Sequence, residues 1–204
     1  MTITWLGHSC FRIEQDGYLL ITDPYTGVAG YPELRAEAHA VYCSHEHFDH
    51  SYRAGVTLLP ERESPFSVRE TASFHDGERG ALRGTNTIRV FTAGGVSVCH
   101  LGDLGHLLSD GQAAEIGQVD VLLVPVGGVY TIGPEEATAE IRKLRPRCAV
   151  PMHYRHPPYG LPNIGGVERV LELFCSGSVE TLPGPSFEVT DRMPEILVPT
   201  FRKG

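Results

Sequence analysis

The residues best suited to chemistry lie together in one short segment, His45-Glu46-His47-Phe48-Asp49-His50. Its three imidazoles and the Asp49 carboxylate are donors that divalent cations accept in proteins. Because side chains of a strand alternate between faces, these donors can converge only if the preceding strand ends near Ser44 and the chain turns there. We therefore expect an open metal site at the end of a strand. Imidazole and carboxylate without thiolate suit Zn²⁺, Mn²⁺ or iron.

The spacing of this segment also carries a family resemblance. His-x-His-x-Asp-His after the apolar stretch Ala40–Cys43 resembles the signature of the metallo-β-lactamase superfamily. Leu6-Gly7-His8-Ser9-Cys10-Phe11, followed by Thr22-Asp23-Pro24, resembles more narrowly its ascorbate-6-phosphate lactonase-like branch of metal-dependent hydrolases. The resemblance implies an α/β fold, a four-layer αββα sandwich of two mixed β-sheets. The alternative is a polar turn that is rich in histidine by chance, since the chain has ten histidines.

The resemblance further implies a middle histidine, a carboxylate and a final histidine in that order along the chain. His75 is the only histidine between residues 51 and 99, Asp103 follows an apolar stretch in Gly102-Asp103-Leu104-Gly105, and His153 ends another. A turn or core-edge residue is the alternative for each. The implied ligands are His45, His47 and His75 for one ion, Asp49, His50 and His153 for a second, and Asp103 between them.

Other polar residues could orient these ligands or contact a substrate. Asp23 precedes Pro24 at a strand end, where it could hold a ligating histidine in place. For each such residue, a hydrogen-bonded turn or a solvated loop position remains the alternative. The full set is His8, Asp23, His106, Tyr130, Arg155 and His156.

The implied chemistry is hydrolysis. Two ions roughly 3.5–4 Å apart would hold a bridging water and lower its pKa toward about 7, giving a hydroxide nucleophile. Zn²⁺ is the first choice, with Mn²⁺ or iron as alternatives. The expected substrate is a small ester, lactone or phosphodiester, with Asp49 and His153 as catalytic residues and Asp49 relaying the proton. Three rivals stay open: a diiron-type redox module, a lipid-head-group phosphodiesterase and a non-catalytic scaffold. The imidazole of His47 disfavours the first, because diiron relatives often have a carboxylate there.

Strands and helices that would present these residues are visible in the hydrophobic pattern. We predict three strands within residues 2–23, with a hairpin at Asp16-Gly17, and a hairpin around Gly94-Gly95. Buried strands are predicted at 40–43, 119–126 and 148–153, and helices at 109–118, 134–145 and 166–175. Short helical turns are predicted at 32–37 and 48–54, and one strand in the tail after residue 183.

Length and composition restrict the class of protein. The 204 residues predict one domain, 1–204, and 41% hydrophobic with 21% charged residues is typical of a globular protein. A net charge of −8 without a basic patch argues for a small-molecule substrate and against nucleic acid. We expect no signal peptide and no membrane contact, because no basic start or long apolar run occurs. Five scattered cysteines without CxxC favour a reducing cytoplasm. The oligomeric state stays open, a homo-oligomer included.

Overall fold

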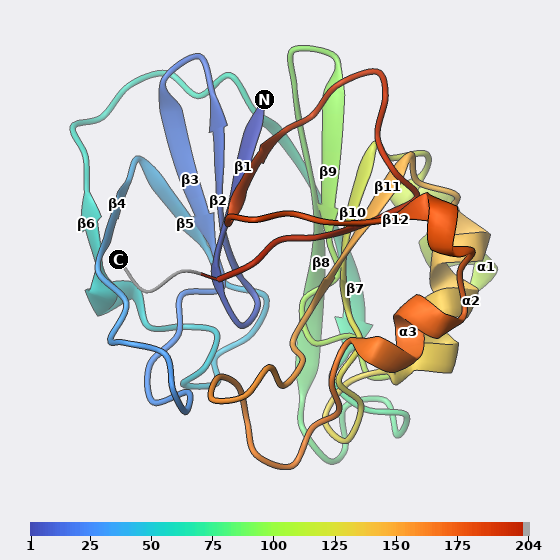
Figure 1. The fold of residues 1–204 in the computed structure, drawn as a ribbon. Coiled ribbons are helices and arrows are strands. Elements are labelled where there is room, and N and C mark those ends of the chain that lie inside the picture. The colour runs from blue at the N-terminus through green and yellow to red at the C-terminus, as the bar shows by residue number, and fades with distance from the viewer. Residues whose placement is uncertain (202–204) are drawn as a thin grey trace.

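The computed structural model describes residues 1–201, so the last three residues of the predicted domain 1–204 lie outside the described part. Two mixed sheets face each other (Figure 1). The first has five strands in the order β13-β1-β2-β3-β5, all antiparallel neighbours except β3 and β5. Its strands are β1 (Thr2–Gly7), β2 (Cys10–Gln15), β3 (Tyr18–Thr22), β5 (Ala40–Tyr42) and β13 (Ser186–Glu188).

The second sheet has seven strands in the order β12-β14-β11-β10-β9-β8-β7. Strands from β12 to β9 pair in parallel, and β8 and β7 add an antiparallel edge. Its strands are β7 (Ser67–Phe74), β8 (Thr85–Ala93), β9 (Val96–His100), β10 (Val121–Pro125), β11 (Cys148–Met152), β12 (Val179–Thr181) and β14 (Ile196–Val198).

The main core lies between the two sheets. Trp5 and Phe11 of the first sheet and Ile88 and Val90 of the second belong to one buried apolar cluster. Alternation along each strand produces this inner face, because every second side chain points inward. Burying one large apolar side chain contributes about 1.5–3 kcal/mol, so this cluster holds the sheets together.

The outer faces of the two sheets are covered differently. Three helices, α1 (Asp110–Ile116), α2 (Pro134–Leu144) and α3 (Glu168–Glu172), gather on the side of the seven-stranded sheet (Figure 1). A capping box of Ser109 and Gln112 starts α1, and Pro134 starts α2. Over the five-stranded sheet lie the strands β4 (Ala36–Ala38) and β6 (Val56–Leu58), with a second apolar cluster beneath them. Within residues 1–201, no helix combines the length and apolarity needed to cross a bilayer.

The predicted sandwich of two mixed sheets is confirmed, but several local predictions are wrong. The helical turn predicted at 32–37 does not form: residues 32–35 are irregular, and residues 36–37 belong to β4, which pairs with β6. The predicted turn at 48–54 forms only a 3₁₀ turn, η1 (Arg53–Gly55), because the backbone N–H of Tyr52 donates to Pro24 instead. Strand β5 is half-buried rather than buried, since it lies at a sheet edge, and the tail adds two strands, β13 and β14.

Strand direction explains how distant residues can meet. In the first sheet β1, β3 and β5 run parallel to one another, and in the second β7, β9, β10 and β11 do. The carboxyl ends of such strands share one edge of a sheet, where ligand sites commonly form. The predicted site residues follow these ends: His8 after β1, Asp23 after β3, residues 45–50 after β5, His75 after β7, Asp103 after β9 and His153 after β11.

Candidate metal centre

Asp103 lies at the middle of a cluster of histidines. Its Oδ2 atom is 3.1 Å from Nε2 of His50, 3.2 Å from that of His75, 3.3 Å from that of His153 and 3.9 Å from that of His45. Asp103 and His153 are almost fully buried, and both line a cavity of about 360 Å³. The cluster is therefore enclosed by protein and open to a small molecule.

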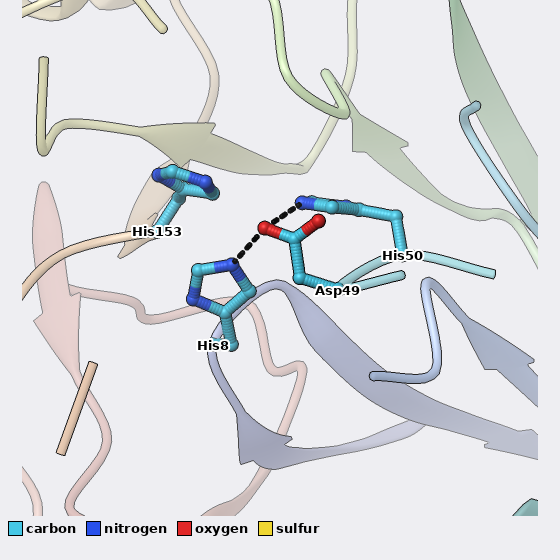
Figure 2. A group of neighbouring side chains, drawn as sticks. All are labelled: His8, Asp49, His50 and His153. Atoms are coloured by element: carbon cyan, nitrogen blue, oxygen red, sulfur yellow. Dashed lines mark hydrogen bonds and ion pairs between the residues drawn. The ribbon is translucent and has the colours of Figure 1, made fainter. Parts of the chain in front are cut away.

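Three overlapping groups of side chains have the spacing of a metal site. Within each group the donor atoms lie within 4.8 Å of one another. The groups are His45, His47 and His75; His45, His50 and Asp103; and His8, Asp49, His50 and His153. Figure 2 shows the last group, with His8 and His50 both directed toward the carboxylate of Asp49. The structure thus brings together all seven residues predicted as ligands, and it adds His8 to them.

Unpaired polar atoms indicate what this cluster accommodates. Nε2 of His45 and His50, both ring nitrogens of His153 and Oδ1 of Asp103 are buried and have no hydrogen-bond partner in the described chain. The close approaches of His45, His50 and His153 to Oδ2 of Asp103 are therefore not hydrogen bonds. A buried polar atom without a partner costs about 1–3 kcal/mol. Bound cations would supply the missing partners, so these residues fit divalent metal ions.

The charge states agree with that fit. Burial lowers the pKa of His45 to about 3 and also lowers that of His75, so both rings are neutral, the form that binds metal. Burial alone would raise the pKa of Asp103, but the nearby His153 and His50 outweigh it and hold that pKa well below its usual value. The neutral rings of His45 and His75 therefore lie beside an ionised carboxylate. Burial would lower the pKa of His50, but Asp103 and Asp23 outweigh it and raise that pKa well above its usual value, so a metal ion bound there would displace a proton from His50.

Asp23, which follows β3, is hydrogen-bonded to the segment that carries His45 to His50. Its Oδ2 accepts hydrogen bonds from Nδ1 of His50 at 2.8 Å and from Oγ of Ser44 at 2.6 Å, and its Oδ1 accepts from the Ser44 N–H at 2.6 Å. Burial opposes the charged form, but His100 and His50 outweigh it and lower the pKa of Asp23 to about 2. The carboxylate therefore fixes the tautomer of His50 and directs its Nε2 into the centre.

The backbone is strained at three residues of the centre. His8, Asp23 and His153 have φ angles of 52°, 43° and 51°, in the left-handed region that non-glycine residues rarely adopt. Such a conformation costs about 1–3 kcal/mol per residue and is typical of functional sites. Beside Asp103, Gly102 has φ 58°, and a Cβ atom there would clash with Oδ1 of Asn86. Only glycine fits at that position.

Asn86 is a functional residue that the sequence analysis missed. Its Oδ1 accepts from the Asp103 N–H at 2.9 Å, while its Nδ2 donates to the carbonyl of Leu101 at 2.9 Å and to Oγ of Ser73 at 2.7 Å. Asn86 thereby holds the loop that carries Asp103. The sequence feature that could have identified Asn86 is its spacing: it lies two residues before the apolar Ile88 and therefore shares the inward face of β8.

The remaining predicted residues fall into two sets. His8 and Tyr130 belong to the centre: Nε2 of His8 is 3.3 Å from Oδ2 of Asp49, and the carbonyl of Tyr130 accepts from Nδ1 of His75 at 3.1 Å. The structure does not bring the other three into the cluster. His106 accepts from the Phe74 N–H, Arg155 donates to the carbonyl of Pro162, and the exposed ring of His156 stacks on Tyr159.

Comparison with known proteins places this arrangement in a family. The model of the β-lactamase superfamily domain matches residues 2–153. A UPF0173 metal-dependent hydrolase of Methanoculleus marisnigri is 31% identical over 93% of this chain and 97% of the relative. A UPF0173 metal-dependent hydrolase of Pyrobaculum neutrophilum is 31% identical, and the match covers 78% of this chain and 86% of the relative. A solved Thermotoga maritima structure, proposed to be a Zn-dependent hydrolase of the metallo-β-lactamase superfamily, is 32% identical with a TM-score of 0.75 and covers 97% of each chain.

The chain therefore belongs to the metallo-β-lactamase superfamily. Within that class it is a metal-dependent hydrolase, similar to the UPF0173 proteins. The cluster of histidines and aspartates at its strand ends agrees with a requirement for divalent metal.

Proposed function

We propose that the chain hydrolyses a small ester, lactone or phosphodiester at a dinuclear metal centre. The convergence of unpaired imidazole nitrogens around Asp103, beside a cavity of about 360 Å³, carries this proposal. His45, His47 and His75 would hold one cation, and Asp49, His50 and His153 would hold the second. Asp103 would contribute its carboxylate to the same centre, and the three groups of donor atoms with metal-site spacing contain all seven residues. We propose Zn²⁺ as the native metal, with Mn²⁺ or iron as alternatives.

When bound, the two cations would polarise the scissile group and make water acidic enough to attack it near neutral pH. The protein contributes the proton transfer. Asp49 lines the cavity and accepts from Nε2 of His8. Burial would raise the pKa of Asp49, but the His8 hydrogen bond and the nearby His50 outweigh it and lower that pKa. Its ionised carboxylate can take a proton from the attacking water and pass it to the leaving oxygen.

His153 is the second catalytic residue of this proposal. It lines the cavity and lies beside His8, with 4.3 Å between the ring centroids. It would help to hold the second cation beside the cavity.

Five free cysteines, four of them buried, agree with a reducing compartment such as the cytoplasm.

A second candidate is a phosphodiesterase acting on lipid head groups. Phe48 lines the cavity and is 57% exposed, and Val129, next to Tyr130 of the lining, is 58% exposed. Exposed apolar residues at the mouth of a cavity can contact an acyl chain. A small polar substrate remains the first choice, because the chain carries a net charge of −8, which disfavours an anionic lipid surface.

Metal analysis of the purified protein, combined with a screen of lactones, phosphodiesters and phospholipid vesicles, tests the proposal. We expect two equivalents of metal per chain and hydrolysis that is lost in His47→Ala and Asp103→Ala. His39→Ala is the matched control, because His39 accepts from the Leu19 N–H outside the centre. Full activity in Asp103→Ala refutes the mechanism. Iron together with oxygen consumption would favour the redox alternative, and hydrolysis of phospholipid alone would favour the second candidate.

A further inference from the structure

The loop between β7 and β8 is built around one buried carboxylate. Asp76 is 2% exposed, and its Oδ1 accepts from the N–H groups of Glu78 and Gly80, both at 2.8 Å. Its Oδ2 accepts from the N–H groups of Leu82 at 3.0 Å and Arg83 at 2.7 Å. These four hydrogen bonds to one carboxylate take the place of the backbone hydrogen bonds that a helix or a sheet would provide. The position of Arg83 is therefore set by Asp76.

This loop is also attached to the metal centre. The N–H of His75 donates to the carbonyl of Gly84 at 3.0 Å, and the Arg83 side chain lines the same cavity as His75, Asp103 and His153. The Arg83 guanidinium lies over the Tyr130 ring, 5.6 Å from its centroid. Tyr130 is itself held in place by the hydrogen bond from His75 to its carbonyl. Arg83 is thus oriented beside the reacting centre before any substrate binds.

Arg83 differs from Arg53 and Arg89 in having no acidic partner among the described residues. Arg53 makes two hydrogen bonds to Glu46, at 2.9 and 2.7 Å, and Arg89 pairs with Glu70 at 2.8 Å. Within residues 1–201 the Arg83 guanidinium has no ion pair and no hydrogen bond. It is also the only lysine or arginine among the described residues that line the cavity. Its planar donors remain available for a group that enters from solvent.

We propose that Arg83 binds a carboxylate or phosphate of the substrate, so that the enzyme prefers esters carrying such a group. This inference rests on the proposed hydrolytic function and specifies the substrate class of the same site. A guanidinium matches carboxylate and phosphate oxygens bidentately, and stacking on an aromatic ring limits the entropy lost on binding. Asp76 acts as the positioning residue for this recognition, because it holds the backbone of Arg83.

The test uses p-nitrophenyl esters of three acids with the metal-loaded protein: butyric (neutral), succinic (carboxylate) and 3-phosphonopropionic (phosphonate). We expect wild-type kcat/KM to favour one or both charged esters over the neutral one. Arg83→Gln should lower this charged-to-neutral ratio about tenfold, as expected for the loss of one charge-assisted pair. The ratio for Arg83→Lys should lie between those of wild type and Arg83→Gln, because lysine keeps the charge but not the planar donors. The charged ester whose kcat/KM falls more in Arg83→Gln shows whether a carboxylate or a phosphate is the recognised group.

Arg79→Gln is the matched control, because Arg79 is exposed on the same loop and does not line the cavity. It should keep the ratio within about twofold of wild type, as is usual for surface substitutions. Metal content and melting temperature of each variant show whether the centre itself is intact. An unchanged ratio in an Arg83→Gln variant with normal metal content refutes the inference.

Calorimetric titration with succinate and with 3-phosphonopropionate separates this inference from the proposed function. If no ester is hydrolysed, the proposed function fails, yet weaker binding of either anion by Arg83→Gln than by wild type would still support anion recognition. Equal affinity in the two proteins, or no binding of either anion to wild type, refutes it. If esters are hydrolysed without dependence on Arg83, the function stands and the inference fails.

Discussion

Replacing Asp23 by Asn should weaken metal binding without a change in the shape of the side chain. Asp23 accepts hydrogen bonds from three donors: Nδ1 of His50, Oγ of Ser44 and the Ser44 N–H. An amide offers one accepting oxygen and one donating nitrogen. If the amide oxygen occupies the position of Oδ2, near His50, the amide nitrogen faces the Ser44 N–H. If the oxygen occupies the position of Oδ1, the amide nitrogen faces Nδ1 of His50, which then has no acceptor. At least one buried donor is left unpaired in either orientation.

The expected magnitudes follow from these contacts. One unpaired buried donor and the loss of charge on the remaining bonds should cost about 2–4 kcal/mol of folding free energy in the metal-free protein. Since His50 is the ring that Asp23 orients, affinity for metal should fall about 10–100-fold, the usual effect of removing a partner of a ligating histidine. Hydrolysis should decline at limiting metal and recover when metal is in excess.

Competition with a chromogenic chelator measures the metal affinity, and urea unfolding of the metal-free protein measures the stability. Asp120→Asn is the matched control. The Asp120 carboxylate accepts from Ser97 and Arg147 at the amino end of β10, the opposite edge from the metal centre. It should lose stability but keep its metal affinity. Wild-type metal affinity in Asp23→Asn would contradict the role assigned to Asp23, however unstable the variant.

Three further predictions concern the centre and its support. Gly102→Ala should cost about 1–2 kcal/mol for its left-handed backbone and about 1–3 kcal/mol more for crowding against Asn86, measured by urea unfolding. Gly84→Ala, at φ +89° with open space, should show only the backbone cost, and equal losses would contradict the packing argument. Chelation should lower Tm by about 5–10 °C if metal is present at about 100 times its Kd, and added Zn²⁺ should restore it; an unchanged Tm counts against a metal-stabilised fold. Burial raises the pKa of Glu140, so the folded state binds this proton more tightly than the unfolded state, and the stability contributed is lost as pH rises from about 4.5 through the raised pKa. The stability of wild type relative to Glu140→Gln should therefore fall as pH rises above about 4.5, and a difference independent of pH would refute this.

Much of the secondary structure could be predicted because its signals are local. The Asp16-Gly17 and Gly94-Gly95 turns have the positive φ angles that their sequences favour. The predicted strand 119–126, which is apolar from residue 121 on, contains a fully buried strand, β10. The helical turn at 32–37 was wrongly predicted. Its last residues instead form β4 by pairing with β6, a partner strand distant in sequence that no local pattern contains.

The amino-acid sequence by itself determined which donors are available and in what order, from His45 through His75 and Asp103 to His153, and that each follows a strand. Those features depend only on residue type and periodicity. Only the tertiary structure decided which of several similar residues join the centre: His8 lies against Asp49, whereas His106 accepts a hydrogen bond from the Phe74 N–H at the end of β7. It also decided that Asn86 holds Asp103 and that Arg83 faces the cavity without an acidic partner. The physical reason is that burial, pairing and unpaired atoms are properties of surroundings, and these surroundings are assembled from segments far apart in the chain.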